Sequence, residues 1–400
     1  MNRTRCLLGF AALSFASTAL GEELLLDSWR QEIDQNAIQV LGENSEGDGV
    51  LVLVKEFLDP AWGERYAERL NSEEYKLVDS KTAESLRLFT ADRSENIAVG
   101  KSFYVNDKYV IPVVKLNTTV DLYEYSPGSA LIGVVSLSLD PAALRIETAY
   151  ALSGGVVVVS SKGSAVAATY YPYDAQHERV TINLGIDPLQ ISDVLETDGK
   201  IYVLATIRSR ASPDSSNPVA AVFDRARLDE IIGEITFDEY AAKTVASGFI
   251  LSTDSTPSIW ITQKNNITDP TRLAVVDLNR IEVLSAVLPE VGAVANIDLV
   301  EACSEKYVYA EIQTVYPPVR RHIQLGLATP TTGVTFLDNS FLPRESGTIL
   351  GVHLYASTDA VFAITNYHQY EETRRSDGFY GWHGFNIFEI SKDQSCNLDV

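Results

Sequence analysis

The chain has 400 residues, of which 46% are hydrophobic and 22% charged, and its formal net charge is −22 at pH 7. This apolar fraction is ordinary for a globular protein. Because so negative a chain is repelled by nucleic-acid backbones and by anionic lipid surfaces, the composition argues against nucleic acid as a partner.

Residues 1–21 contain the three regions of a secretory signal peptide. Arg3 and Arg5 give a positive start, an apolar stretch runs to Leu20, and small residues form a cleavage site before Glu22. The stretch is too short and too rich in serine and threonine for a membrane anchor, and no later segment approaches the roughly twenty apolar residues of a membrane helix. We therefore expect an exported protein, periplasmic or secreted, without a membrane span.

A repeated unit follows along the rest of the chain. A turn, a short β-rich run, a polar loop and a second such run recur seven times, at intervals of roughly fifty residues. A period of this size that carries strands predicts a β-propeller with one blade per repeat. Such a ring grows by adding blades, so we expect residues 22–400 to form a single domain. The runs begin at Val50, Tyr109, Val156, Ile201, Ile259, Tyr307 and Val361.

The fourth repeat shows the expected blade most clearly. Its Asp198-Gly199 pair suits a tight hairpin, because glycine accepts a positive φ without steric penalty. The expected elements are strands at Ile191–Glu196, Ile201–Ile207, Val219–Phe223 and Glu234–Phe237, a long polar loop at Arg208–Pro218 and a short helix over Asp224–Ile232.

The chain resembles the β-propeller superfamily, at the level of the fold, over nearly all of the mature sequence. The repeats contain no recurring Trp-Asp pair, no regular double glycine and no periodic tryptophan among the four present, so they match no WD, kelch or quinoprotein consensus. The resemblance implies an all-β, seven-bladed propeller and brings no family chemistry with it. Six or eight blades stay open, because the first repeat is the most divergent.

The two ends of the chain predict how the ring closes. The last repeat has a third strand at Phe385–Ile390 and then only a short tail, with no good fourth strand. Glu23–Trp29, meanwhile, precedes the first strand of the first blade, expected at Ala37–Leu41. We predict that the N-terminal segment supplies the outer strand of the last blade and covers its sheet edge.

Two cysteines remain after removal of the signal peptide, Cys303 and Cys396. In an oxidising compartment such a pair has one possible connectivity, and the absence of a CxxC sequence argues against a zinc site. A bridge would join the sixth repeat to the tail after the seventh. Two free thiols are the alternative, because the sequence does not give the geometry of the sulfur atoms.

Basic and aromatic residues concentrate in the loops between second and third strands. These loops are expected to be long and to share one face with the connections between blades, and such loops often hold binding residues. Arginine and aromatic side chains bind carboxylates, phosphates and sugars and are enriched in protein interfaces; alternatively, they only order their own loops. The expected binding residues are Trp62, Arg208, Arg320, Arg321, Tyr367, His368, Arg374, Arg375, Tyr380, Trp382 and His383.

Signatures of catalysis are scarce. The chain has no HExxH and no GxSxG sequence, so it assigns no catalytic residue. His368 and His383 are expected to approach each other across one hairpin, which is weak support for a metal site without a placed carboxylate. Acids on first strands are candidates to line the axial channel and to bind calcium there, although a solvated position is the simpler expectation. These acids are Asp193, Glu196, Asp298 and Glu301.

These features favour an exported, non-enzymatic propeller without a cofactor, which binds a protein or a glycan, anionic ligands included, through its long-loop face. The alternative is an enzyme, for instance a lactonase-like hydrolase or lyase, with polar groups in the axial funnel and calcium as a candidate cofactor there, and a third hypothesis is a structural envelope component. The absence of a linear catalytic motif favours binding only modestly, because propeller enzymes assemble their sites from single residues on separate blades.

Overall fold

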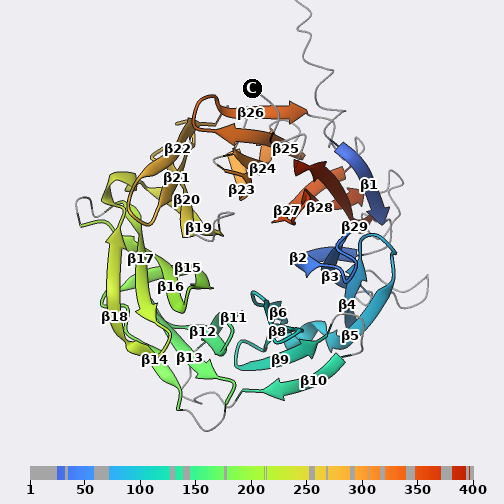
Figure 1. Cartoon of the computed structure of the whole chain (residues 1–400), viewed down its shortest axis with the longest axis horizontal. Helices are drawn as coiled ribbons and strands as arrows, with labels where there is room; N and C mark the ends of the chain where they lie inside the picture. The colour runs from blue at the N-terminus through green and yellow to red at the C-terminus, as the bar shows by residue number, and fades with distance from the viewer. Residues whose placement is uncertain are drawn as a thin grey trace, which may run out of the picture.

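The computed structural model describes residues 25–31, 35–57, 72–126, 131–137, 145–174, 178–210, 212, 214–251, 257–266, 269–288, 293–304, 306–315, 320–338, 347–370, 381–392 and 396. These residues form seven small antiparallel sheets arranged in a ring (Figure 1). The protein is therefore an all-β, seven-bladed propeller, as the repeats predict, and the six- and eight-bladed alternatives are excluded. Two 3-10 segments, η1 (Arg93–Glu95) and η2 (Asp238–Tyr240), lie between strands, and Lys392 and Cys396 have helical backbone after β29.

Blades one to four follow the chain from its N-terminal side, and the strands of each run in order from the inner to the outer position. Blade one has β2 (Gln35–Glu43), β3 (Val50–Phe57), β4 (Ser72–Asp79) and β5 (Ser85–Asp92). Blade two has β6 (Ala98–Val99) and β7 (Phe103–Val105) on its inner side, then β8 (Lys108–Lys115), β9 (Thr119–Tyr125) and β10 (Leu131–Ser136). Blade three has β11 (Arg145–Ala151), β12 (Gly155–Lys162), β13 (Ala165–Pro172) and β14 (Val180–Ile182). Blade four has β15 (Pro188–Thr197), β16 (Lys200–Arg208), β17 (Ser216–Asp224) and β18 (Arg227–Thr236).

Blades five to seven complete the ring. Blade five has β19 (Thr244–Leu251), β20 (Pro257–Lys264), β21 (Arg272–Asp277) and β22 (Glu282–Val287). Blade six has β23 (Ala293–Cys303), β24 (Lys306–Val315), β25 (Arg320–Thr329) and β26 (Gly333–Asp338). Blade seven has β27 (Gly347–Ala356), β28 (Ala360–Tyr370), β29 (Gly381–Ser391) and, as its outer strand, β1 (Leu25–Gln31).

The apolar runs that define the repeats are the second strands of the blades. In β16, every residue between Lys200 and Arg208 is buried. A strand with a neighbouring sheet on each side buries both of its faces, so it is apolar throughout instead of alternating. In β12, Val157 and Val159 pack towards blade four, whereas Val156 and Val158 pack towards blade two. One run thus supplies two cores.

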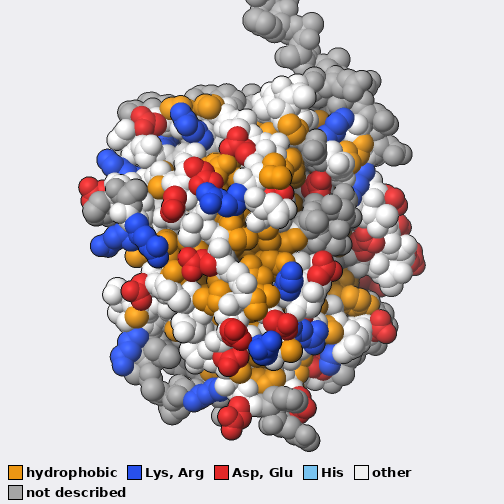
Figure 2. Space-filling view, turned by 60° about the vertical axis from the view of Figure 1, so that its left-hand side comes forward, with side chains coloured by type: hydrophobic (Ala, Val, Ile, Leu, Met, Phe, Trp, Pro, Cys, Tyr) orange, Lys and Arg blue, Asp and Glu red, His pale blue; other side chains and the backbone are white. Residues whose placement is uncertain are grey.

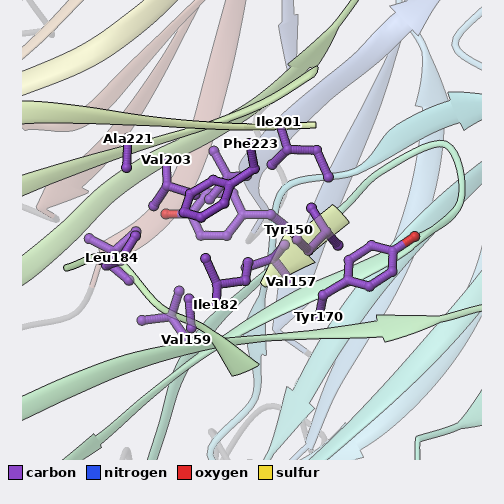
Figure 3. Close-up of a cluster of buried hydrophobic side chains, with 14 of the residues drawn as sticks. Tyr150, Val157, Val159, Tyr170, Ile182, Leu184, Ile201, Val203, Ala221 and Phe223 are labelled. Carbon is purple, nitrogen blue, oxygen red and sulfur yellow. The ribbon is translucent and has the colours of Figure 1, made fainter. Parts of the chain in front are cut away.

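Figure 3 shows the core between blades three and four. Val157 and Val159 meet Val203 and Phe223 there, and Tyr150 from β11 packs with them. Since each blade contributes one face to such a core on either side, no blade buries its apolar residues without its neighbours.

The ring closes as predicted. β1 pairs antiparallel with β29, from Leu25 opposite Ile390 to Gln31 opposite Phe385, with one bulge. The sheet of blade seven therefore contains β1 as well as the last three strands of the chain. β1 covers the edge of β29, which would otherwise be exposed.

Side chains also join blade seven to blade one. The Asn366 amide donates to the Ala37 carbonyl oxygen at 2.7 Å and accepts from the Ala37 N–H at 2.8 Å. Near the other end of β2, the Glu43 carboxylate accepts from the Thr358 N–H at 2.7 Å and from its hydroxyl at 3.2 Å. The seam of the ring is thus hydrogen-bonded near both ends of β2.

Cys303 and Cys396 form a disulfide, with their Cα atoms 6.1 Å apart. Lys306 Nζ donates to the Cys396 carbonyl oxygen at 2.6 Å. The bridge ties the end of β23 in blade six to the segment that follows β29, which confirms the predicted pairing.

Two expectations for blade four are wrong. Residues 224–232 do not form a helix: Asp224 lies opposite Arg227 in a tight hairpin, and β18 follows at once. Leu228 and Ile231 pack into the core between blades three and four, and this tertiary contact overrides the helical tendency of the local sequence. The expected loop at 208–218 is also shorter, since β16 includes Arg208 and β17 starts at Ser216.

The connections between second and third strands are uneven, which corrects the expectation that all are long. In blades two and three they are tight turns at residues 116–118 and 163–164. Leu116 and Asn117 have φ near +54° and Gly163 has φ of 62°, the left-handed backbone that such turns require. The longest connections, 58–71 and 371–380, belong to blades one and seven, which are neighbours in the ring.

Candidate functional site

The connections between second and third strands share one end of the ring with the connections between blades. We call it the loop end, and the opposite one the turn end. The last residues of the second strands mark the loop end: Phe57, Lys115, Lys162, Arg208, Lys264, Val315 and Tyr370.

The predicted binding residues, except Arg208, belong to three consecutive blades. Arg320 and Arg321 are the first residues of β25, in blade six. In blade seven, His368 lies near the end of β28, and Trp382 and His383 lie at the start of β29. Trp62, Arg374, Arg375 and Tyr380 fall outside the described residues, in the connections after β3 and β28.

The β28–β29 register brings two of these residues together. His368 lies directly opposite His383, and Gln369 lies opposite Trp382. The two histidines thus meet across one hairpin, as the sequence predicts. Among the described side chains, no group of three or more His, Cys, Asp and Glu residues is placed to hold a metal ion.

Tyr367 and Arg208 stand apart from this group. The Tyr367 side chain is 3% exposed and packs with Ile312 and Ile323 in the core between blades six and seven, so it serves packing there. Arg208 is exposed at the end of β16 in blade four, and two blades separate it from blade seven on the shorter way round the ring.

Polar residues on the inner side of the blades form an axial layer, which consists of Gln39, Asp193, Asp298 and His353 in first strands and Lys101 between β6 and β7. Asp193 and Asp298 occupy equivalent positions, opposite Leu204 and Ala310 in their respective second strands. Lys101 reaches Asp193 from blade two, with its Nζ 2.8 Å from Asp193 Oδ1. Charged groups from separate blades therefore meet around the axis of the ring.

The axial carboxylates bind neighbouring first strands. Asp193 Oδ2 accepts from the Phe249 N–H of blade five at 3.1 Å, and Asp298 Oδ2 accepts from the Leu354 N–H of blade seven at 2.7 Å. The Gln39 amide is likewise bonded to the Ser102 hydroxyl of blade two at 2.7 Å. These side chains link adjacent blades, so the expectation that they are merely solvated is wrong.

Burial dominates the electrostatics of this layer. Burial raises the pKa of Asp298 to about 6, the Asp193 charge adds to this rise, and the N–H donors and Lys101 oppose it. Burial also lowers the pKa of His353, on the adjacent first strand. A carboxyl group that protonates near neutral pH is thus part of the ring's internal bonding.

Glu196 also makes a contact between blades, at the turn end. Its carboxylate accepts from the Ser153 N–H at 2.6 Å and from the Ser153 hydroxyl at 2.5 Å, and Arg225 lies 3.3 Å away. Glu43 binds Thr358 of the preceding blade in the same way. The sequence signal for this role was an acid near the end of a first strand and a hydroxyl residue in the preceding blade's turn. Glu301 is buried at the corresponding place in blade six.

No family model matches the chain, and no curated protein matches it. Among solved structures, a prolyl endopeptidase is 12% identical over 85% of this chain, with a TM-score of 0.49. The chain spans only 48% of that enzyme's length.

Two smaller proteins are similar over nearly their whole length. The WD40 domain of SCAP from fission yeast is 8% identical, with coverage of 90% of this chain and 96% of its own and a TM-score of 0.46. An uncharacterized protein from Listeria monocytogenes is 8% identical, with coverage of 89% and 97% and a TM-score of 0.47. These similarities concern the fold alone. In the described part of the chain, no helix is long and apolar enough to cross a membrane.

Proposed function

We propose that the protein is an exported, non-enzymatic propeller that binds a protein or glycan partner through the loop end of blades six, seven and one. The observation that carries this proposal is that Arg320, Arg321, His368, Trp382 and His383 lie at the loop ends of strands in the consecutive blades six and seven, next to the long connections of blades seven and one. In a ring, consecutive blades adjoin, so strand ends that are far apart in the sequence lie near one another at the loop end.

The β28–β29 hairpin supports the proposal through its rigidity. Both strands have 11 residues, and their pairing continues without a bulge from Ala360 opposite Ser391 to Tyr370 opposite Gly381. A fully paired ladder therefore leads up to the connection at 371–380. Binding residues held by such a scaffold lose little conformational entropy on association.

The axial layer gives less support to the enzymatic alternative. Asp193 and Asp298 accept from backbone N–H groups of the next blade or pair with Lys101. In a catalytic or calcium-binding role these carboxylates would have to keep their bonds between blades while they also contact a ligand.

The test replaces residues 372–379 of the full chain by a short Gly-Ser linker and leaves the β28–β29 ladder intact. The matched control shortens residues 252–256, the turn-end connection of β19 and β20 in blade five. Each protein is immobilised and exposed to an envelope extract of the source organism and, separately, to polygalacturonate, and bound material is quantified by mass spectrometry and by carbohydrate assay. Loss of a partner from the first variant, with retention by the control, is the expected result. Equal binding by both variants and the parent would refute the proposal.

A further inference from the structure

Blade two ends in an outer strand that contains no charged residue. β10 has the sequence LIGVVS and, among the described residues, pairs with β9 alone. An outer strand presents a row of unpaired N–H and C=O groups, and proteins usually protect such an edge with charged residues. The other outer strands, apart from the three-residue β14, follow this rule with Arg30 in β1, Arg87 in β5, Glu234 in β18, Glu282 in β22 and Asp338 in β26.

The outer strand of blade four shows this protection. Figure 2 brings the β18 side of the ring forward, and acidic and basic side chains are interspersed with apolar ones over this side. In β18 itself, Arg227, Asp229, Glu230 and Glu234 are exposed. A further strand at this edge would have to accommodate these charges, whereas β10 imposes no such cost.

The hydrogen bonds of β10 determine which of its backbone groups face outward. The Leu137 N–H donates to the Val120 carbonyl oxygen of β9 at 2.9 Å. Successive residues of an antiparallel strand alternate between bonding the partner strand and pointing away from it. Val135 is therefore bonded to β9, whereas Val134 and Ser136 direct their N–H and C=O groups away from it. These groups are placed to pair with a further strand.

The side chains at this edge are apolar on both faces of the sheet. Val134 and Val135 are 47% and 52% exposed. Val134 lies opposite Tyr123, which belongs to the core between blades one and two. Val135 lies opposite Leu122, which belongs to the core between blades two and three. A strand added to β10 would therefore extend both cores.

The carboxylates of the neighbouring strand β9 are paired with lysines. Lys115 Nζ lies 2.9 Å from Asp121 Oδ2, and Lys108 Nζ lies 2.7 Å from Glu124 Oε2. The rim of blade two thus combines an uncharged strand with compensated acids, in a chain whose formal net charge is −22. Two copies of so acidic a chain repel each other, and this repulsion opposes a contact least where the contact itself has no net charge.

The edge of β10 is also complementary to itself. In an antiparallel pair of two β10 strands with a two-fold axis at Val135, Val134 of each copy lies opposite Ser136 of the other. The outward N–H groups of one copy then meet the outward C=O groups of the other. The two Val135 side chains lie side by side on one face, and cross-strand pairs of β-branched residues stabilise a sheet.

We propose that two copies of the protein associate through β10, with the outer strands of their second blades paired antiparallel about a two-fold axis at Val135. Interfaces below about 1,200 Å² are weak or transient, and one strand from each copy gives a contact of this class. The dimer therefore forms in a concentration-dependent manner. It uses no residue of the surface on blades six, seven and one, so failure of either proposal leaves the other intact.

Sedimentation velocity measures the association of the full chain over a wide range of concentrations, at low and at physiological salt. Val135→Lys places a charge at the centre of the strand pair, and Val134→Pro removes an N–H that the β9–β10 pair does not use. The control is Val287→Lys, the same substitution at a residue that is 59% exposed in β22, the outer strand of blade five. Unchanged circular dichroism and melting temperature establish that each variant folds.

The parent and the control are expected to show the same monomer–dimer equilibrium, which strengthens as salt screens the repulsion between the acidic copies. Val135→Lys and Val134→Pro are each expected to raise the dissociation constant of the dimer at least tenfold. Val135→Cys tests the register, because directly opposed residues of a non-hydrogen-bonded pair lie close enough for a disulfide. Mild oxidation should cross-link Val135→Cys and leave Val287→Cys monomeric.

Three results would overturn the proposal. They are a parent that stays monomeric at every concentration and salt, a dimer that Val135→Lys leaves unchanged, and equal cross-linking of Val135→Cys and Val287→Cys. A monomeric parent that binds a labelled peptide of sequence LIGVVSL would assign the edge to a strand of another protein, which would also overturn the dimer.

Discussion

Replacing Asn366 by alanine tests whether the seam between blades seven and one depends on a single amide. The substitution removes both hydrogen bonds to Ala37 and leaves a buried N–H and a buried carbonyl without a partner. Ala37 is only 4% exposed, so water does not easily replace the amide. An unsatisfied buried group costs about 1–3 kcal/mol, and we expect Asn366→Ala to lower the free energy of unfolding by about 3 kcal/mol.

The Asn366→Asp variant makes the test specific to hydrogen bonding. Its carboxylate still accepts from the Ala37 N–H, but it places an oxygen against the Ala37 carbonyl. We expect it to be less stable than Asn366→Ala at pH 7 and to recover at low pH, where the protonated carboxyl donates. Urea unfolding followed by tryptophan fluorescence at both pH values measures this difference. A loss below about 0.5 kcal/mol for Asn366→Ala, or identical behaviour of the two variants at both pH values, would show that the seam does not rely on these bonds.

Further expectations concern the other links in the ring. Replacing Cys303 and Cys396 by serine should lower the free energy of unfolding by about 4–5 kcal/mol, the chain-entropy value for a sequence separation of 93 residues, measured by denaturation with and without reductant. Deleting β1 should uncover the edge of β29 and produce concentration-dependent association, which size-exclusion chromatography detects; a monomer of unchanged stability would contradict the closure role. The pKa of Asp298, about 6 in the folded protein against about 3.9 when unfolded, means that the folded state binds more protons between these values. Stability should therefore fall by up to about 3 kcal/mol as the pH rises from 4 to 7, and Asp298→Asn should flatten this dependence.

The repeat pattern predicts the ring because its physical cause is local. A second strand packed between two sheets must be apolar on both faces, so β3, β8, β12 and β16 are each visible as a short apolar run. The closing strand was predictable for a related reason, since blade seven lacked a fourth strand and the N-terminal segment had no other sheet to join. Outer strands are harder to recognise in the sequence. β18 contains charged and helix-favouring residues, and it is a strand because it pairs with β17 in a hairpin.

The candidate site was less predictable than the fold. The sequence predicted that arginine and aromatic residues lie in loops. It did not show that the pairing of β28 and β29 extends to Tyr370, or that Tyr367 is buried in the core between blades six and seven. The Ser216–Ala242 bridge had no sequence signal either, because it joins residues of two different blades. Residues gathered by contacts between blades have no fixed spacing along the chain.

The acids of the first strands show why a residue type alone does not identify a site. Asp193 and Asp298 lie on inner strands near the axis, and each is opposite the fourth residue of the apolar run in its repeat, Leu204 and Ala310. Each nevertheless uses an oxygen to bind an N–H of the following blade, which makes the carboxylate part of the contact that holds first strands together. Removing such a group affects the ring before it affects any ligand. An exposed side chain at the loop end, such as that of Arg208, can change without loss of such a carboxylate bond, and this difference is the physical reason to look for function there.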